Sequence, residues 1–274
     1  MIVLSLILAL TTLCCPPDTT TSTQYNSSPS ISRLGLIAGS TVISATALYI
    51  YQRNAWWKDQ RGPFHIQNDW EYALWADKLG HLLGGIFISK LYHHLFLWAG
   101  LSDHTSQWIG AGVGSLYLLY IEVQDGFARD WGFSPGDAAF DLIGAFYPLL
   151  QRRFPLLQPI SIKMSYWPSG RPNKAVFDDY EGQTYWLTAN LRALGIRQSP
   201  SWLNLAIGYA ARKPGRWGFL TEPRFFVGID FELSDLLTPR VTQLPFAKPL
   251  LESFHAPAPA LQVYPRLKPW LLGY

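Results

Sequence analysis

The hydrophobic pattern of the chain changes after Pro159, and this change limits the folds that the chain can adopt. From Pro159 to residue 237, apolar residues alternate with polar or small residues in four segments. The four apolar sets are Ile160, Ile162, Met164 and Tyr166; Tyr185, Leu187, Ala189 and Leu191; Leu203, Leu205, Ile207 and Tyr209; and Phe225, Val227, Ile229, Phe231 and Leu233. Because such alternation gives a strand one apolar face, residues 159–237 are predicted to form a small antiparallel β region.

Before Pro159 the apolar segments have the length and the end signals of helices. They run from Leu34 to Tyr51, from Asn68 to Trp98, from Gln107 to Gln124 and from Ser134 to Arg153. Asn68 and Ser134 are helix-capping residue types, and Pro135 suits the first helical position. Residues 34–158 are therefore predicted to form a bundle of about four helices, and the fold class is α+β. A closed membrane barrel needs about eight strands or more, so the sheet is expected to pack on this bundle.

Composition favours a protein at a membrane. Charged residues make up 15% of the 274 residues, against about 25% in soluble domains. The 12 Trp and 14 Tyr residues suit a lipid–water boundary, where amphipathic rings settle. The run from Leu34 to Tyr51 is close to the length of about 20 residues that crosses a bilayer. The net charge of +3 is small and scattered, which excludes nucleic acid as the expected partner. The membrane is the expected partner, and protein partners stay undefined.

The two ends of the chain have distinct compositions. Residues 1–33 combine an apolar run with a Ser/Thr-rich stretch, which predicts an export signal and a flexible tether. Cys14 and Cys15 at the junction are candidates for lipidation. The lack of Lys or Arg before Arg33 and the bulky Leu13 argue against it, so both alternatives stay open. Residues 238–274 contain many prolines and no periodicity, and an irregular tail is predicted there.

Acidic and imidazole side chains recur in pairs within the apolar helices. The pairs are Asp77 and His81, Glu122 and Asp125, and Asp137 and Asp141. Because each pair is spaced i,i+3 or i,i+4, both members point to the same side of a helix. Ionisable groups in apolar surroundings are unfavourable unless they interact with one another. The pattern predicts one shared polar site between packed helices, with a divalent cation as a possible cofactor bound by His81, Glu122 and Asp125.

Each pair also has a purely structural interpretation. Asp77 and His81 can form a hydrogen-bonded pair that fixes the register of the helix, and Lys78 can add an ion pair. Asp137 is explained as the acid that completes the helix cap of Ser134. Asp141, one turn deeper, has no such explanation. The candidate site residues are therefore Asp77, His81, Glu122, Asp125 and Asp141.

The same residues carry a resemblance to a known family. The chain resembles the YfiM-like family of predicted periplasmic lipoproteins of unknown function over roughly residues 34–237. The motifs that carry the resemblance include Asp77-Lys78-x-Gly80-His81, Glu122-x-x-Asp125-Gly126-Phe127, Trp131-Gly132-Phe133-Ser134-x-x-Asp137 and Asp179-Tyr180-x-Gly182-Gln183-Thr184-Tyr185-Trp186. More distantly, the order of acidic and His residues is similar to that of VanZ-like membrane proteins, which are linked to glycopeptide tolerance. Neither resemblance implies an established reaction.

These observations lead to two hypotheses of function. The first is a membrane-associated protein on the periplasmic side of the envelope of a Gram-negative bacterium, with a buried site of structural or ligand-binding role. The alternative is a metal-dependent hydrolase or transferase that acts on a lipid or cell-wall precursor. The chain has no G-x-S-x-G nucleophile motif, and its GxGxG run at residues 110–114 lacks the strand and acidic residue of a nucleotide-binding fold, so the sequence assigns no reaction.

Overall fold

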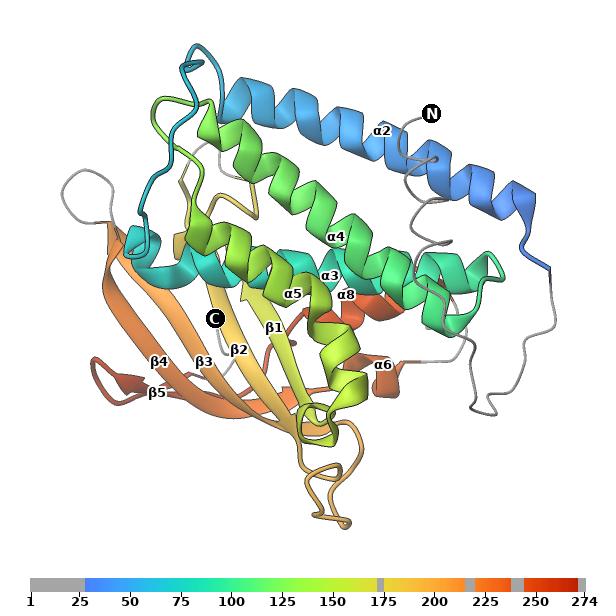
Figure 1. The fold of residues 1–274 in the computed structure, drawn as a ribbon. Helices are drawn as coiled ribbons and strands as arrows, with labels where there is room; N and C mark the ends of the chain where they lie inside the picture. The colour runs from blue at the N-terminus through green and yellow to red at the C-terminus, as the bar shows by residue number, and fades with distance from the viewer. Residues whose placement is uncertain (1–27, 172–174, 215–219, 238–243, 271–274) are drawn as a thin grey trace.

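The fold consists of long helices followed by an antiparallel sheet, which confirms the α+β prediction (Figure 1). The structure is a computed structural model that describes residues 28–171, 175–214, 220–237 and 244–270. The predicted export signal, Cys14, Cys15 and most of the predicted tether lie outside these residues. Residues 31–33, which were assigned to the tether, begin the first described helix instead.

Among the residues that the structure describes, four long helices precede the sheet. They are α2 (Ile31–Ala55), α3 (Ala76–Trp98), α4 (Asp103–Gly126) and α5 (Pro135–Arg153). The helices α3, α4 and α5 pack against one another, whereas α2 lies along the edge of this group (Figure 1). Near its start α2 is fixed by Arg33, which donates to the carbonyl of Trp98 at 2.6 Å, and near its end by Gln52, which donates to the Tyr117 hydroxyl at 3.3 Å.

Among the described residues, α2 is the one helix that is long and apolar enough to cross a membrane. Ser30 caps its start, and no charged residue lies between Arg33 and Arg53. Most of the helix is not buried against the rest of the protein. Val42 and Ile43 at its middle are 64% and 71% exposed. A helix with apolar side chains on its free side has the features of a membrane anchor or a signal segment.

Helix α3, which corresponds to the predicted helix from Asn68 to Trp98, begins later than the sequence predicts. Asn68 was expected to cap it, but α3 starts at Ala76, after a 3₁₀ turn at Tyr72–Trp75. Ala73, Leu74 and Trp75 have positive φ angles of 49°, 52° and 70°. Left-handed backbone costs about 1–2 kcal/mol per residue outside glycine, so the surrounding structure must hold this turn. One such contact is the Tyr209 hydroxyl, which donates to the carbonyl of Leu74.

Glycines allow the three packed helices to approach closely. A Cβ atom added at Gly85 in α3 would lie 2.6 Å from the Ala145 backbone nitrogen of α5 and 2.7 Å from the Asp141 carbonyl oxygen. Gly110 of α4 meets the backbone of α3 in the same way. A Cβ atom added at the neighbouring Gly84 would meet only the Leu118 side chain, at 3.8 Å. The small residues therefore serve close backbone packing, but Gly85 rather than Gly84 is the residue in contact with α5.

In the described part of the chain the sheet has six strands in the order of the sequence, each antiparallel to the next. The strands are β1 (Ile160–Tyr166), β2 (Gln183–Asn190), β3 (Leu203–Pro214), β4 (Leu220–Phe231), β5 (Ala260–Tyr264) and β6 (Lys268–Trp270). The first four correspond to the four predicted alternating segments. Leu233 is an exception, because it lies in the short helix α6 (Leu233–Leu236).

The prediction of an irregular tail at residues 238–274 is wrong for its described part. This segment forms the helix α8 (Ala247–Ser253) and the last two strands. Its prolines lie where they do not interrupt a ladder: Pro249 is within the short helix, and Pro269 is in the terminal strand β6, which pairs on one side with β5. The strand pairs of residues 260–270 are too short to show a period in the sequence, and β4 supplies the partner that orders them.

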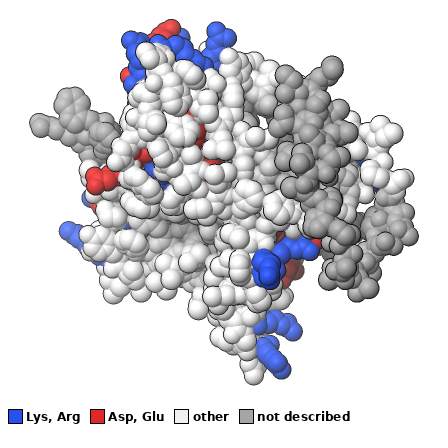
Figure 2. All heavy atoms as spheres, viewed as in Figure 1, with Lys and Arg blue, Asp and Glu red and all other residues white. Residues whose placement is uncertain are grey.

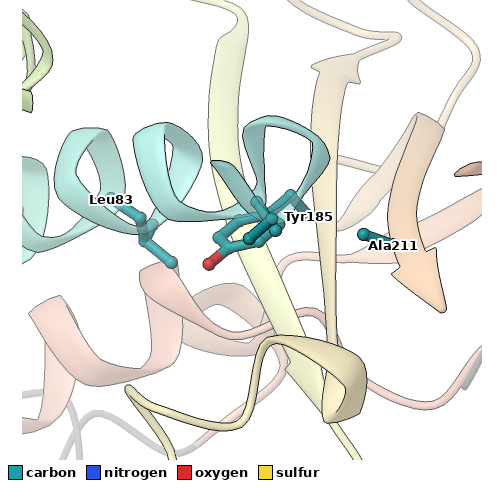
Figure 3. Packing of buried hydrophobic residues seen from close by; sticks show 5 residues of the cluster. Leu83, Tyr185 and Ala211 are labelled. Atoms are coloured by element: carbon teal, nitrogen blue, oxygen red, sulfur yellow. The ribbon is translucent and has the colours of Figure 1, made fainter. Parts of the chain in front are cut away.

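The sheet packs on the helices through β2 and β3. Tyr185 of β2, Leu83 of α3 and Ala211 of β3 belong to one buried cluster, shown in Figure 3. Ala73 and Ala76 complete it. The Tyr185 ring therefore lies beside the first turns of α3, which carry Asp77 and His81. This contact joins the predicted β region to the predicted site.

Candidate functional site

Three helix ends meet at the predicted polar site. Asp77 and His81 lie at the start of α3, Asp137 and Asp141 at the start of α5, and Glu122 near the end of α4. Helix N-termini carry partial positive charge, so the starts of α3 and α5 stabilise carboxylates. The C-terminal end of α4 has the opposite effect on Glu122. A partner outside its own helix must therefore hold the Glu122 side chain.

Lys78 holds one half of the site. Its ammonium is 0% exposed and lies 2.9 Å from Asp69, 3.3 Å from Asp77 and 2.8 Å from Asp137. Burial alone would lower the pKa of Lys78, but the charges of Asp77 and Asp137 and the hydrogen bonds to Asp137 and Asp69 raise it overall. Lys78 therefore stays charged and offsets part of the negative charge around it.

His81 holds the other half. Its Nδ1 lies 2.8 Å from Asp141 Oδ1 and 3.8 Å from Glu122 Oε1, while its Nε2 lies 3.8 Å from Asp77 Oδ1. Burial opposes the charged form of His81, yet the hydrogen bond with Asp141 and the charges of Asp77 and Asp141 raise its pKa well above the ordinary value. The His81 imidazole is therefore protonated near neutral pH when only protein groups surround it.

Asp141 is the hydrogen-bond partner of His81. It is 0% exposed, and its second carboxylate oxygen, Oδ2, has no hydrogen-bond partner among the described residues. A buried acceptor without a partner is unusual in native proteins and points to a group that is bound there. Burial raises the pKa of Asp141, while the hydrogen bond with His81 opposes that shift.

Glu122 and Asp125 differ in surroundings although they are one turn apart. Glu122 is buried and accepts a hydrogen bond from the Ser134 backbone nitrogen at 3.2 Å. Burial raises the pKa of Glu122 to about 9, and the His81 charge opposes that shift. Asp125 accepts from the Trp57 indole nitrogen, and burial raises its pKa to about 6. Glu122 is thus a neutral acid at pH 7, whereas Asp125 is mostly ionised.

Asp137 has a larger role than the sequence indicates. Ser134 caps α5 as predicted, because its hydroxyl accepts from the Asp137 backbone nitrogen at 3.1 Å. The Asp137 carboxylate, however, forms the ion pair with Lys78, and the Ser134 backbone nitrogen donates to Glu122 instead. The interpretation of Asp137 as only a capping acid is therefore wrong. Burial and then the charge of Asp77 raise its pKa to about 7.

Two donor sets of the site are close enough to hold a metal ion. In each set the donor atoms lie within 4.8 Å of one another; the sets are Asp77, His81 and Asp137, and His81, Glu122 and Asp141. Lys78 already binds both acids of the first set, which disfavours a cation there. The second set contains Asp141, whose Oδ2 has no hydrogen-bond partner among the described residues, and therefore fits a cation better. Asp125, predicted as a ligand, belongs to neither set among the described residues.

Two further side chains of the site carried no signal in the local pattern. Asp69, in the loop before α3, binds Lys78 and accepts from the Ser134 hydroxyl at 2.6 Å. Tyr180, in the 3₁₀ turn Tyr180–Gly182 before β2, donates its hydroxyl hydrogen to Asp77. Both lie outside the long helices, so a search for helical spacing does not find them. Tyr180 connects the β region directly to the site.

No family model, no curated protein and no solved structure matches this chain. The geometry of the site is therefore the basis for the function proposed below.

Proposed function

We propose that the protein is a membrane-associated protein of the bacterial cell envelope and that its buried Asp/His/Glu site binds a divalent cation. The observation that carries this proposal is the Asp141 carboxylate, which is fully buried with one oxygen on His81 and the other without a partner among the described residues. Buried carboxylate oxygens usually have a hydrogen-bond partner, and Asp141, unlike the other buried acids with an unpartnered oxygen among the described residues, belongs to a donor set that Lys78 does not already bind. A cation at that oxygen supplies the missing interaction.

The charge balance of the site supports the same proposal. Five carboxyl groups share the positive charges of Lys78 and His81; they are Asp69, Asp77, Glu122, Asp137 and Asp141. The surplus is relieved by protonation of Glu122, or by a cation that takes the place of that proton. His81, Glu122 and Asp141 would hold the ion, and an oxygen- and nitrogen-donor set suits Mg²⁺, Mn²⁺ or Zn²⁺. Because His81 and Glu122 must lose protons to become ligands, binding is expected to tighten as pH rises.

Metal analysis of the full chain tests this proposal. The protein is purified in detergent without chelator, its metal content is measured, and the chelator-treated protein is titrated calorimetrically with Mn²⁺, Zn²⁺ and Mg²⁺. The wild type is expected to bind one of these ions stoichiometrically, and Asp141→Asn is expected to lose the binding while retaining the acceptor for His81. Asp125→Asn is the matched control, because Asp125 is a half-buried acid near the end of α4, one turn from Glu122, but lies outside the donor set.

Two outcomes would contradict the cation proposal. A folded wild-type protein that takes up none of the three ions would leave a structural role for the site. Equal losses of binding in Asp125→Asn and Asp141→Asn would place the ion elsewhere.

The structural role has its own test, since Asp77→Ala and Glu122→Ala should then mainly reduce stability. If both variants are as stable as the wild type and yet lose a cellular phenotype, the structural role is wrong.

We infer the location from α2 and from the motifs. The apolar helix α2 near the N-terminus, the one such helix in the described part of the chain, supports membrane association. The periplasmic side, and membership of the YfiM-like family, are what the motif resemblance implies. Protease treatment of intact cells and of spheroplasts tests the side, because an envelope protein facing the periplasm becomes accessible only when the outer barrier is opened.

The second candidate function is a metal-dependent hydrolase or transferase acting on a lipid or cell-wall precursor. The observation that favours it is the pairing of a neutral acid, Glu122, with the His81–Asp141 dyad at 3.8 Å. Environments that make the pKa values of neighbouring titratable groups differ are typical of sites of acid–base chemistry. Release of phosphate from a short polyprenyl diphosphate by the metal-loaded wild type, absent in Asp141→Asn, is the expected result. No release with any of the three ions would count against this class of substrate.

A further inference from the structure

The face of the sheet that packs on α3 continues beyond the helix as an exposed apolar surface. Leu187, Ile207, Val227 and Leu261 lie opposite one another in four neighbouring strands and so form one row across the sheet. Their exposed fractions are 49%, 58%, 48% and 39%. Tyr185, which shares this face, is covered by α3, but the row lies outside that contact. We refer to these four residues as the apolar row.

The opposite face of the sheet is buried, and it carries ion-paired and hydrogen-bonded polar side chains beside an apolar cluster that includes Trp186 and Phe226. Lys163 and Asp230 are each 0% exposed and form an ion pair at 2.8 Å, and Asn204 donates to the same Asp230 oxygen at 2.8 Å. The Trp186 indole donates to the Ser165 hydroxyl at 2.9 Å, and the ring stacks on His255. A sheet in water usually covers its apolar side chains and exposes its polar ones, whereas here the apolar row is exposed and the Lys163–Asp230 pair is buried. Strands with apolar residues outside and polar residues inside are typical of proteins in lipid.

Exposed apolar side chains also occur on the helices. They include Leu116 and Val123 on α4, which are 51% and 41% exposed, and Ile143 on α5, which is 50% exposed. Figure 2 shows mostly uncharged atoms over the centre of the view, and most of the charged side chains lie towards its edges. The helices α4 and α5 and the strands β1–β4 are seen in the same view of the ribbon (Figure 1). Within the sheet, the apolar row is formed by four neighbouring strands and is therefore not an isolated exposed residue.

We propose that the apolar row contacts the acyl chains of a lipid bilayer. The helices α3–α5 and the sheet would thus contact the hydrocarbon region directly, in addition to being anchored by α2. This deepens the proposed membrane association and rests on it. The row offers a protein partner no side chain that forms hydrogen bonds, whereas a protein interface typically has about ten hydrogen bonds. Lipid requires none.

The ends of the strands support lipid as the occupant. Arg192 and Arg197 lie exposed in the connection between β2 and β3 at one end. At the other end, Trp167 is 64% exposed and the Lys213 side chain is 69% exposed. Basic and aromatic residues at both borders of an apolar band are typical of proteins at membrane interfaces. The strands β3 and β4 have 12 residues each, or about 40 Å, which exceeds a hydrocarbon thickness of about 30 Å.

Lipid quenching of a fluorescent label tests this proposal on the full chain. The label, an environment-sensitive nitrobenzoxadiazole, is attached at Ile207→Cys or Val227→Cys in a background with Cys14→Ser and Cys15→Ser. Labelled protein is reconstituted into vesicles of phosphatidylcholine and phosphatidylglycerol with and without brominated acyl chains. Leu36→Cys on the exposed side of α2 reports on the anchor, and Asp130→Cys in the exposed loop after α4 is the water-facing control. Thermal unfolding confirms that each labelled protein is folded.

The proposal expects brominated lipid to quench the labels at 207 and 227 as strongly as the label at 36, and to leave the label at 130 unchanged. If only the label at 36 is quenched, and iodide reaches the labels at 207 and 227, the helices α3–α5 and the sheet lie in water and the inference is wrong while the membrane anchor stands. If the labels at 207 and 227 are shielded from both quenchers, a second copy or another protein covers the row, which also overturns it. If no label is quenched, the membrane association proposed above fails as well.

Discussion

A pair of adjacent glycines in α3 allows a sharp test of how the site is assembled. Alanine at Gly84 or Gly85 adds the same methyl group to the interior of the same helix. At Gly84 the new Cβ would lie 3.8 Å from the flexible Leu118 side chain. At Gly85 it would lie 2.6 Å from the Ala145 backbone nitrogen and 2.7 Å from the Asp141 carbonyl oxygen. The two variants therefore differ in helix packing but not in helix propensity.

The expected free energies follow from these distances. Replacing a helical glycine by alanine stabilises a helix by about 1 kcal/mol, so Gly84→Ala should raise the free energy of unfolding by up to that amount. Heavy atoms pack best at about 3.5–4.0 Å, so Gly85→Ala requires α3 and α5 to separate by about 1 Å. Overpacking costs about 1–3 kcal/mol, and the rigid backbone opposite Gly85 places this position near the upper limit. After the helix-propensity gain, a net loss of about 2 kcal/mol remains, so the variants differ by about 3 kcal/mol.

The assay is urea unfolding of the full chain in mild detergent, followed by Trp fluorescence. A difference of about 3 kcal/mol corresponds to midpoints separated by about 1 M urea or more. A second measurement connects packing to the site. Because the Asp141 hydrogen bond helps to raise the pKa of His81, separating α3 from α5 should lower that pKa in chelator-treated Gly85→Ala, as followed by NMR of the imidazole. Equal urea midpoints, or a more stable Gly85→Ala, would refute the close approach of the two helices.

Three further predictions concern buried charges. Lys78→Met removes the cation that binds three carboxylates and should cost about 3–5 kcal/mol of unfolding free energy, whereas the exposed Lys213→Met should change it by less than about 0.5 kcal/mol in the same urea assay. Burial lowers the pKa of His255 to about 4, below its unfolded value of about 6.5. The contribution of the neutral His255 side chain to stability is therefore complete above a pH of about 6.5. About 3 kcal/mol of unfolding free energy is lost as the pH falls towards 4. His255→Phe, which retains an aromatic ring, should remove this part of the acid sensitivity, and an unchanged pH profile would contradict the assignment. Trp57→Phe removes the donor to Asp125 and should raise the pKa of that carboxyl above about 6, as read by carboxyl-carbon NMR; an unchanged pKa would show that the hydrogen bond does not stabilise the charged form.

The sequence determined the local elements because their periods are local. Ser134 and Pro135 mark the start of α5, and the alternating segments after Pro159 match β1–β4. The i,i+4 spacing of Asp77 and His81 places both at the start of one helix, where the structure has them. A period of two or of 3.6 is visible within a few residues, so it needs no information about distant contacts. The strands β5 and β6 escaped prediction because β4 orders them and their own residues show no period.

Only the tertiary structure decided which polar groups interact. Asp137 has the spacing of a capping acid, yet its carboxylate binds Lys78, which lies on another helix. The bond between Asp141 and His81 depends on how closely α3 and α5 approach, and Gly85 permits that distance. The alternation of the strands likewise identified an apolar face, but not that the face with Lys163 and Asp230 is also buried. The physical reason is the same in each case. Spacing along a chain fixes the side of an element to which a residue points, whereas the packing of distant elements fixes what lies there.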